Sequence, residues 1–227
     1  MPLVVIEGLD GAGKSTQIEW LRDYFSRLGK VCRYVHFPRT DAPVYGALVS
    51  RFLRGELGDI HTVNPYLVAL IYAGDRLDFK PVLQQWLMDE GVVLLDRYVY
   101  SNIAYQCAKL PAGQREDLCR WILDLEFGYH GLPVPDATLF LDVPFRFTAG
   151  KLAETRQGVD RDYLMGKQDI HEADLDFQRQ VQQVYSSLAG SPGFVRIDCA
   201  DANGAMLPPA AISDKILQVL GTTRVIS

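Results

Sequence analysis

The chain has 227 residues, of which 48% are hydrophobic, 22% charged and 11% aromatic. That length favours one domain, or one domain with a mobile insertion, because single hydrophobic cores keep growing to roughly 250 residues. Lys and Arg number 23 against 28 Asp and Glu, which gives a formal net charge of −5. General nucleic-acid binders are usually basic, so the charge balance argues against nucleic acid as a partner.

Cysteine usage and the first residues point to an intracellular protein. Cys32, Cys107, Cys119 and Cys199 are widely scattered, which fits neither a disulfide framework nor a zinc knuckle. The amino-terminal MPLVVIEG has no positively charged region, and no segment approaches the roughly 20 apolar residues of a membrane span. We therefore expect a soluble cytoplasmic protein with reduced thiols and no membrane partner.

Short apolar runs alternate with longer amphipathic stretches along the whole chain. Each run is rich in branched or aromatic residues and bounded by Gly, Pro or Asp, which predicts strands covered on both faces. The predicted strands are Leu3–Ile6, Val31–Phe37, Val92–Leu95, Thr138–Val143 and Phe194–Ile197. Strands that alternate with helices imply parallel βαβ units. We therefore predict a three-layer α/β/α fold with a five-stranded parallel sheet.

The first predicted strand is followed by a glycine-rich loop. Residues 8–15 read GLDGAGKS and satisfy the pattern G-x-x-x-x-G-K-[ST] completely. The glycines let successive amide groups converge on a phosphate, and the following helix, predicted at Thr16–Leu28, adds the positive end of its dipole. Lys14 would reach the outer phosphates and the hydroxyl of Ser15 would meet Mg²⁺. The residues predicted to bind ATP are Gly8, Leu9, Asp10, Gly11, Ala12, Gly13, Lys14, Ser15 and Thr16.

Further along the chain, Asn64 and Pro65 predict the start of a helix, with Asn64 as its N-cap. Pro81 should break or kink that helix. The segment Arg156–Asp169 is strongly charged, contains two glycines and has little periodicity, which indicates a lid or a surface segment. The chain becomes helical again from about Ala210 to Leu220.

The third predicted strand ends in a carboxylate. Val92–Asp96 is an apolar run that closes on Asp96, as a Walker B segment does. Beside a P-loop, Asp96 together with Ser15 would hold Mg²⁺, directly or through water. Arg97 follows at the carboxyl edge of the predicted sheet, where ligands of parallel sheets bind. The guanine-reading tetrapeptide Asn/Thr-Lys-x-Asp is absent, which argues against a GTPase switch.

Together these motifs resemble those of thymidylate kinases. The P-loop of that family appears at residues 7–16 as EGLDGAGKST, and its DRY-type segment appears at residues 96–105 as DRYVYSNIAY. The resemblance continues through GLPVPD at 131–136 and LFLDV at 139–143 to a helix expected at Asp169–Tyr185, so it covers most of the chain.

The resemblance implies one P-loop kinase domain, residues 1–227, with the P-loop three-layer α/β/α fold, its five-stranded parallel sheet and a helical lid at about 144–170. It implies transfer of the γ-phosphate of ATP to dTMP, giving dTDP and ADP with Mg²⁺, and the homodimer typical of the family. Helices around Val44–Leu53 and Asn64–Phe79 are candidate interface elements. The rival interpretations are a kinase for another deoxynucleotide or a deoxynucleoside, and a P-loop regulatory protein without turnover.

The resemblance also assigns residues to dTMP. Tyr72 would stack on the thymine ring, and Arg76, four residues later on the same helix face, would donate to thymine O4. Arginine carries only donors, so it prefers thymine or uracil over cytosine, which has an amino group there. From the residues alone, core packing of Tyr72 and a surface ion pair of Arg76 with Asp75 or Asp78 stay open.

The remaining substrate residues follow the same resemblance. Phe37 would pack beside the base, Arg39 and Arg97 would bind the monophosphate, and Tyr105 would crowd the sugar 2′ position. Asp10 would hold the acceptor sugar near its 3′-hydroxyl, and Arg51 either joins the phosphate site or lies on a solvated helix face. The set assigned to dTMP is Phe37, Arg39, Tyr72, Arg76, Arg97, Ser101, Tyr105 and Gln106.

Phosphoryl transfer also needs positive charge around the moving group. Some thymidylate kinases carry an arginine directly after the P-loop carboxylate, whereas Gly11 stands there in this chain. A charged segment is usually a solvated face, yet a closing lid commonly supplies such charge. We therefore predict that Arg156 or Arg161 contributes it. The residues predicted to be catalytic are Asp10, Lys14, Arg97, Arg156 and Arg161.

Overall fold

The fold is built on one parallel sheet of five strands. The computed structural model describes residues 1–153, 159–167 and 169–222. The strands are β1 (Leu3–Glu7), β2 (Cys32–His36), β3 (Val92–Asp96), β4 (Ala137–Asp142) and β5 (Phe194–Asp198). Their order across the sheet is β2-β3-β1-β4-β5, and all four pairings are parallel. Each predicted strand is confirmed to within one residue at either end.

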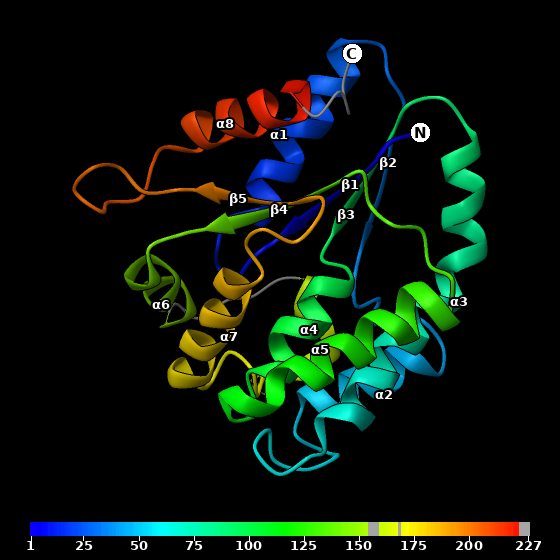
Figure 1. Ribbon diagram of the computed structural model, residues 1–227, viewed down its shortest axis with the longest axis vertical. Coiled ribbons are helices and arrows are strands. Elements are labelled where there is room, and N and C mark those ends of the chain that lie inside the picture. Colours follow the sequence, from blue (N-terminus) through cyan, green and yellow to red (C-terminus); the bar gives the residue numbers. More distant parts are fainter. Residues whose placement is uncertain (154–158, 168, 223–227) are drawn as a thin grey trace.

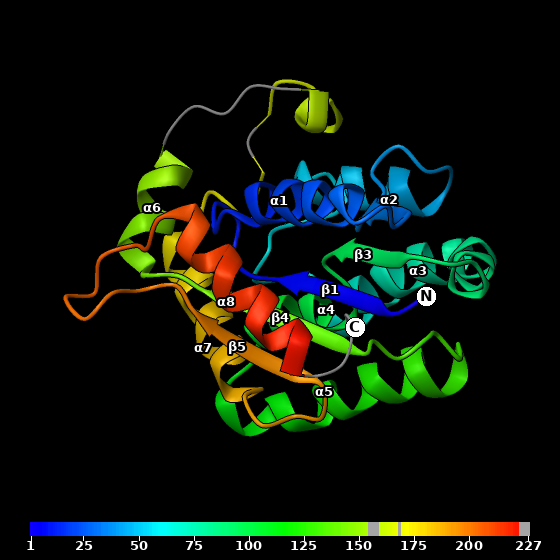
Figure 2. The same cartoon turned by 90° about the horizontal axis from the view of Figure 1, so that it is seen from above.

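Helices cover both faces of the sheet, which confirms the three-layer prediction. Helices α1 and α8 lie together on one face, and α3, α4, α5 and α7 lie on the other (Figures 1 and 2). The α-helices are α1 (Lys14–Arg27), α2 (Tyr45–Leu53), α3 (Pro65–Met88), α4 (Val99–Cys107), α5 (Arg115–Leu123), α6 (Phe145–Ala153), α7 (Leu175–Ser187) and α8 (Pro209–Thr222). Shorter helical segments lie at Ala112–Gln114, Asp124–Tyr129 and Val159–Leu164.

Helix α3 starts as predicted, and of the two outcomes predicted for its proline, a break or a kink, it shows the second. Asn64 caps its start as expected, because its side chain accepts a hydrogen bond from the amide of Tyr66 at 2.9 Å. Pro81 does not end the helix, which runs on to Met88. In Figures 1 and 2 the helix instead changes direction along its length, as a helix with an internal proline commonly does.

Helix α7 begins later than expected. The prediction placed its start at Asp169, but it starts at Leu175, because Asp174 acts as the N-cap and accepts from the amide of Phe177 at 2.8 Å. Asp169 and His171 lie in the preceding loop and are both nearly buried. The shift moves these two side chains from a helix face to the wall of a cavity.

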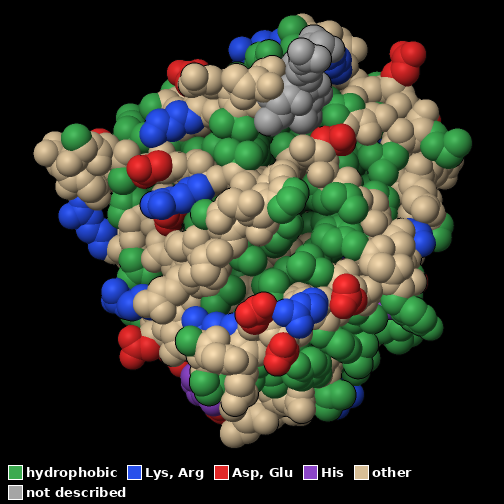
Figure 3. Space-filling model, in the orientation of Figure 1, with side chains coloured by type: hydrophobic (Ala, Val, Ile, Leu, Met, Phe, Trp, Pro, Cys, Tyr) green, Lys and Arg blue, Asp and Glu red, His purple; other side chains and the backbone are tan. Residues whose placement is uncertain are grey.

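The core lies between the sheet and its two helical layers. Strands β1, β3 and β4 are buried at every position, as continuous apolar runs require, whereas the edge strands β2 and β5 are partly exposed. No helix in the described ranges is long and apolar enough to cross a membrane. On the face drawn in Figure 3, acidic and basic side chains are interspersed.

Candidate active site

A cavity of about 830 Å³ opens at the carboxyl ends of β1, β2 and β3. Its wall combines the P-loop, the segments after β2 and β3, helices α3 and α4, and the loop before α7. The predicted residues that line it are Asp10, Gly11, Ala12, Gly13, Lys14, Ser15, Thr16, Phe37, Arg39, Tyr72, Arg76, Asp96, Arg97, Ser101, Tyr105 and Gln106. Gly8 and Leu9, the first two residues of the P-loop, are buried and do not line the cavity.

The P-loop joins β1 to the amino end of α1. Gly11 and Gly13 have φ values of 78° and 81°, a region that glycine adopts without steric cost. Lys14 is the first residue of α1 and is nearly buried, and its ammonium donates to the carbonyls of Gly8 and Leu9 at 3.3 and 3.0 Å. Burial lowers the pKa of Lys14, and the neighbouring Arg97 lowers it further. The amino end of α1 and this lysine form a site for anionic oxygens.

Arg97 lies at the centre of a hydrogen-bond network. Its guanidinium donates to Asp10 Oδ1 at 2.6 Å, to Ser101 Oγ at 3.1 Å and to Tyr105 Oη at 3.2 Å. Tyr105 in turn donates to the other Asp10 oxygen at 2.7 Å. Burial alone would raise the pKa of Asp10, but the charges of Arg97 and Lys14 hold it well below its usual range. The network therefore fixes an ionised carboxylate and a guanidinium on one wall of the cavity.

Arg76 faces the cavity from α3, but its main partner was not foreseen. Its Nη2 donates to Glu126 Oε1 at 2.7 Å, its Nε donates to the second carboxylate oxygen, and both side chains are fully buried. Asn102 donates to the same Glu126 oxygen at 2.9 Å. The alternative ion pairs with Asp75 or Asp78 are wrong. Two nitrogens of Arg76 are bonded to Glu126, which leaves its Nη1 donors for the cavity.

Arg39 bonds to Asp75 and Asp78, the two aspartates that the sequence had left open as partners of Arg76. Its Nε donates to Asp75 at 2.9 Å and its Nη2 to Asp78 at 2.7 Å, while the guanidinium lies 4.9 Å from the ring centre of Phe79. A phosphate bound by Arg39 would therefore contact a guanidinium that is already bonded to two carboxylates. Phe37 is fully buried against Phe79, so it forms part of the apolar wall.

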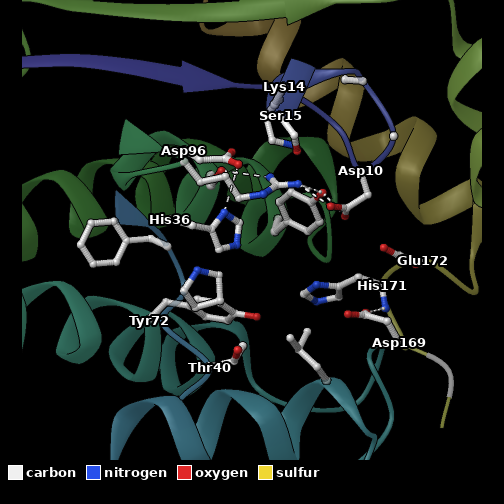
Figure 4. Close-up of a pocket in the computed structure, with 18 of the residues that line it drawn as sticks. Asp10, Lys14, Ser15, His36, Thr40, Tyr72, Asp96, Asp169, His171 and Glu172 are labelled. Carbon is white, nitrogen blue, oxygen red and sulfur yellow. Dashed lines mark hydrogen bonds and ion pairs between the residues drawn. The ribbon is translucent and has the colours of Figure 1, made fainter. Parts of the chain in front are cut away.

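Ser15 and Asp96 lie on the same side of the cavity (Figure 4). Oδ2 of Asp96 lies 3.1 Å from Nδ1 of His36, while Oδ1 is buried and has no hydrogen-bond partner. Burial would raise the pKa of Asp96, but His36, Lys14 and Arg97 together lower it, so the carboxylate is ionised.

An ionised carboxylate with a free oxygen and a nearby hydroxyl are hard donors that suit Mg²⁺. The described residues hold no group of three or more His, Cys, Asp or Glu side chains that could hold a metal ion by themselves. Mg²⁺ usually binds proteins through one or two carboxylates together with substrate phosphates. Ser15 and Asp96 therefore fit the ion that the sequence predicted.

The comparisons with known proteins agree with this geometry. The family model described as thymidylate kinase matches residues 6–204. The chain belongs to the thymidylate kinase family. It is 35% identical over 187 residues to the thymidylate kinase of Mycobacterium tuberculosis, covering 82% of this chain and 85% of that protein. It is 32% identical over 193 residues to the thymidylate kinase of Leifsonia xyli, covering 83% and 82%.

A solved structure agrees at the level of the fold. The thymidylate kinase of Candida albicans aligns with a TM-score of 0.73 and 23% identity, covering 98% of this chain and 92% of the other. The resemblance predicted from the motifs is thus confirmed for both the family and the fold.

This thymidylate kinase family member carries a group of cavity residues that the sequence did not single out. Asp169, His171 and Glu172 form the wall that faces Asp10 (Figure 4). Asp169 accepts from the hydroxyl of Tyr163 at 2.9 Å, and burial, together with repulsion from Asp10, raises its pKa to about 7. The charged character of the region was visible in the sequence, but nothing there indicated that Asp169 and His171 are buried.

The imidazole of His171 is enclosed by the rings of Tyr105, Phe52 and Phe177. Burial lowers its pKa well below the usual value, and its Nε2 has no hydrogen-bond partner. The ring is therefore neutral and packs against the tyrosine that contacts Asp10.

The predicted lid cations are only partly described. Arg156 lies outside the described residues. Arg161 belongs to the short helix Val159–Leu164, and at Arg161 only the backbone is described. Their proposed role stays a prediction. Arg51 is half-exposed and lies 3.5 Å from Glu56, away from the cavity wall.

Proposed function

We propose that this chain transfers the γ-phosphate of ATP to dTMP, giving ADP and dTDP. The observation that carries the proposal is one cavity that joins a complete P-loop to the linked residues Asp10, Arg97 and Tyr105. The family assignment supplies the acceptor. A phosphate site and a sugar-sized polar site in one cavity are what a nucleoside monophosphate kinase requires.

Tyr72 and Arg76 would select the base. Both line the cavity from α3, and Tyr72 is held edge-on by Phe52. The free Nη1 donors of Arg76 would meet thymine O4, where cytosine presents an amino group instead. Glu126 fixes the guanidinium through two bonds, so the donors cannot follow a wrong base. Phe37 and Gln106 would complete the wall around the base.

Asp10 and Tyr105 would set the sugar. The Asp10 carboxylate is ionised and already accepts two hydrogen bonds, so a 3′-hydroxyl would add a third. Tyr105 would crowd a 2′-hydroxyl and thereby favour deoxyribose. Arg97 and Arg39 would bind the monophosphate. Ser101 would contribute through Arg97, because its hydroxyl donates to Glu7 and accepts from Arg97 at 3.1 Å.

Catalysis would consist of alignment and charge stabilisation, without a covalent enzyme intermediate. Lys14 would leave the loop carbonyls and move onto the outer phosphates of ATP. Ser15 and Asp96 would hold Mg²⁺, which neutralises phosphate charge when bound. Arg97, together with Arg156 or Arg161 from the region after α6, would meet the charge that develops on the transferred group.

An ADP-release assay tests the proposal. Purified protein should release ADP from MgATP only when dTMP is present, should act less efficiently on dCMP, and should leave thymidine unphosphorylated. Lys14→Ala should lower the turnover severely, because it removes charge at the transferred group. ADP release that does not depend on an acceptor would contradict the kinase assignment, and a preference for thymidine would contradict the acceptor.

We also propose that two copies associate through α2 and α3. Leu67, Leu70, Gly74 and Leu77 recur three or four residues apart on α3, and the three leucines are exposed. Tyr45 of α2 covers Gly74 so closely that a Cβ there would meet its ring. An exposed apolar face on one helix can pack against the same face of a second copy, which is the contact that a two-fold axis produces.

We propose the cytoplasm as the location. All four cysteines are free. Thiols that remain unpaired are typical of a reducing compartment.

A further inference from the structure

A histidine that the proposed mechanism does not use lies beside Asp96. His36 is the last residue of β2 and Asp96 the last of β3, and the parallel register pairs the two directly. Paired residues on neighbouring strands project from the same face of the sheet. The imidazole Nδ1 therefore lies 3.1 Å from Asp96 Oδ2, while the ring borders the cavity and is 47% exposed (Figure 4).

Asp96 has no other direct side-chain partner within the described part of the chain. Its Oδ1 is buried without a hydrogen bond. Lys14 and Arg97 are close enough to lower the pKa of Asp96, but neither bonds to it. Lys14 donates to backbone carbonyls of the P-loop, and Arg97 donates to Asp10. Among the described residues, the contact with His36 is thus the direct side-chain interaction that can hold the carboxylate in one orientation.

The sheet does not need this bond. Strands β2 and β3 pair over their whole length, and the amide of Phe37 donates to the carbonyl of Asp96 at 2.9 Å just beyond the pair. The side chain of His36 is also half-exposed, so it contributes little to the core. The position of His36 is better explained by its effect on Asp96: it contacts one carboxylate oxygen and leaves the other without a hydrogen bond.

We propose that His36 is a positioning residue for the divalent ion. Its Nδ1–H holds Oδ2 of Asp96, so that Oδ1, which has no hydrogen-bond partner, stays available to the ion. This inference rests on the proposed function, which places Mg²⁺ at Ser15 and Asp96. A carboxylate with one oxygen tethered presents a preformed donor, whereas an untethered one must be ordered when the ion binds.

Three variants separate positioning from structure. His36→Ala removes the donor. His36→Asn keeps an amide N–H near the place of Nδ1 and should restore the bond. His61→Ala is the matched control, because His61 is also about half-exposed and pairs with an aspartate, Asp174 at 2.9 Å, but does not line the cavity.

Divalent-ion binding is measured without turnover. Mn²⁺ is titrated by electron paramagnetic resonance into each protein saturated with the non-hydrolysable analogue AMP-PNP, in the absence of dTMP. Hydrogen-bond partners of metal-ligating side chains are typically worth about 10- to 100-fold in metal affinity. We expect His36→Ala to bind Mn²⁺ about 10-fold more weakly, His36→Asn to stay within about threefold of the wild type, and His61→Ala to match it. The thermal unfolding midpoints of the proteins without ligand should not rank the variants in the same order as their Mn²⁺ affinities.

A double-mutant cycle tests the route of the effect. If His36 acts through Asp96, His36→Ala should cause no further loss of Mn²⁺ affinity in an Asp96→Asn background. Wild-type affinity in His36→Ala, or the same fold-loss in both backgrounds, would overturn the proposal. A wild-type protein that binds Mn²⁺ and AMP-PNP but does not phosphorylate dTMP would overturn the proposed acceptor and leave the role of His36 standing.

Discussion

The Arg76–Glu126 pair links the base selection proposed for Arg76 to the stability of the fold. Both side chains are fully buried, and the carboxylate also accepts from Asn102. A buried ion pair gives little net stability, but removing one partner leaves an uncompensated charge in the interior. A substitution of Arg76 therefore changes two properties that an activity assay alone would mix.

Two variants separate these properties. Arg76→Ala should lower the free energy of unfolding by about 3–5 kcal/mol, because Glu126 is left buried and unpaired. Arg76→Met combined with Glu126→Gln removes both charges, keeps an acceptor for Asn102, and should recover most of that loss. Both variants should lose the preference for dTMP over dCMP. Urea unfolding measures the stability, and kcat/KM for dTMP and dCMP measures the preference. A double variant that still prefers dTMP would show that Arg76 does not read the base.

Asp169 gives a pH dependence whose sign is fixed by its environment. Burial and repulsion from Asp10 raise its pKa from 3.8 to about 7. Between these two values the folded chain binds more protons than the unfolded chain, so the stability contributed by this group falls as pH rises.

We therefore expect Asp169→Asn to gain stability relative to the wild type between pH 5 and pH 8, by roughly 2 kcal/mol. Chemical denaturation at several pH values measures the difference. The exposed Asp214→Asn variant on α8 is the control and should run parallel to the wild type. A constant difference between Asp169→Asn and wild type would mean that Asp169 stays ionised throughout this range.

At this scale the sequence predicted what is local in the chain. The P-loop and the Asp96–Arg97 pair could be identified because their residues are contiguous and their neighbours are strands and helices. Glu126 could not be identified, since it lies 50 residues from Arg76 and belongs to no motif. Which aspartate pairs with which arginine likewise depends on packing. The residues alone left Asp75 open as a partner of Arg76, whereas Arg39 is the arginine that bonds to it.

At the scale of elements, Glu7 connects β1 to two helices. It is fully buried at the end of β1, and one carboxylate oxygen accepts from the amides of Tyr98 and Ser101 at 2.9 and 3.1 Å. The other accepts from the hydroxyls of Ser101 and Tyr185. The strand thus supplies the cap for the start of α4, where Tyr98 offers no side-chain cap.

Replacing Glu7 should therefore affect helix α4 as a unit. Glu7→Ala leaves two amides without an acceptor in the interior, while the hydroxyls of Ser101 and Tyr185 still lie 2.8 Å from each other. We expect a loss of about 3 kcal/mol in unfolding free energy. Glu7→Gln keeps an acceptor for the amides and should cost only about 1 kcal/mol. Urea unfolding compares them, and equal losses would mean that the hydrogen bonds to α4 contribute little.

The elements themselves were largely predictable. Buried parallel strands appear as short apolar runs, which is why all five strands were found within one residue. The helix boundaries were harder, because several residues can act as caps. Asp169 and Asp174 both precede the periodic stretch of α7, and only the packed structure selects Asp174.

At the scale of the whole molecule, helix α3 exposes an apolar face in a single copy of the chain. Leu67, Leu70 and Leu77 lie together there, and Tyr45 extends the face from α2. The sequence already indicated these helices as interface elements through the family resemblance. The exposure of individual leucines could not be predicted, because α3 has apolar residues on most sides.

Leu70→Glu tests whether this face joins two copies. Leu70 is 42% exposed, so a glutamate there can be solvated in a single copy but would be buried in a two-fold contact opposite its own equivalent. Like charges in a buried contact are costly, and light scattering after size exclusion should therefore report a change from twice the chain mass to the single mass. Leu175→Glu is the matched control, because Leu175 is 44% exposed on α7, far from α3 in the sequence, and should leave the mass unchanged. Circular dichroism should show the same helix content in all three proteins. If Leu70→Glu keeps the double mass, the copies associate through another surface, and a wild-type protein of single mass would contradict the association itself.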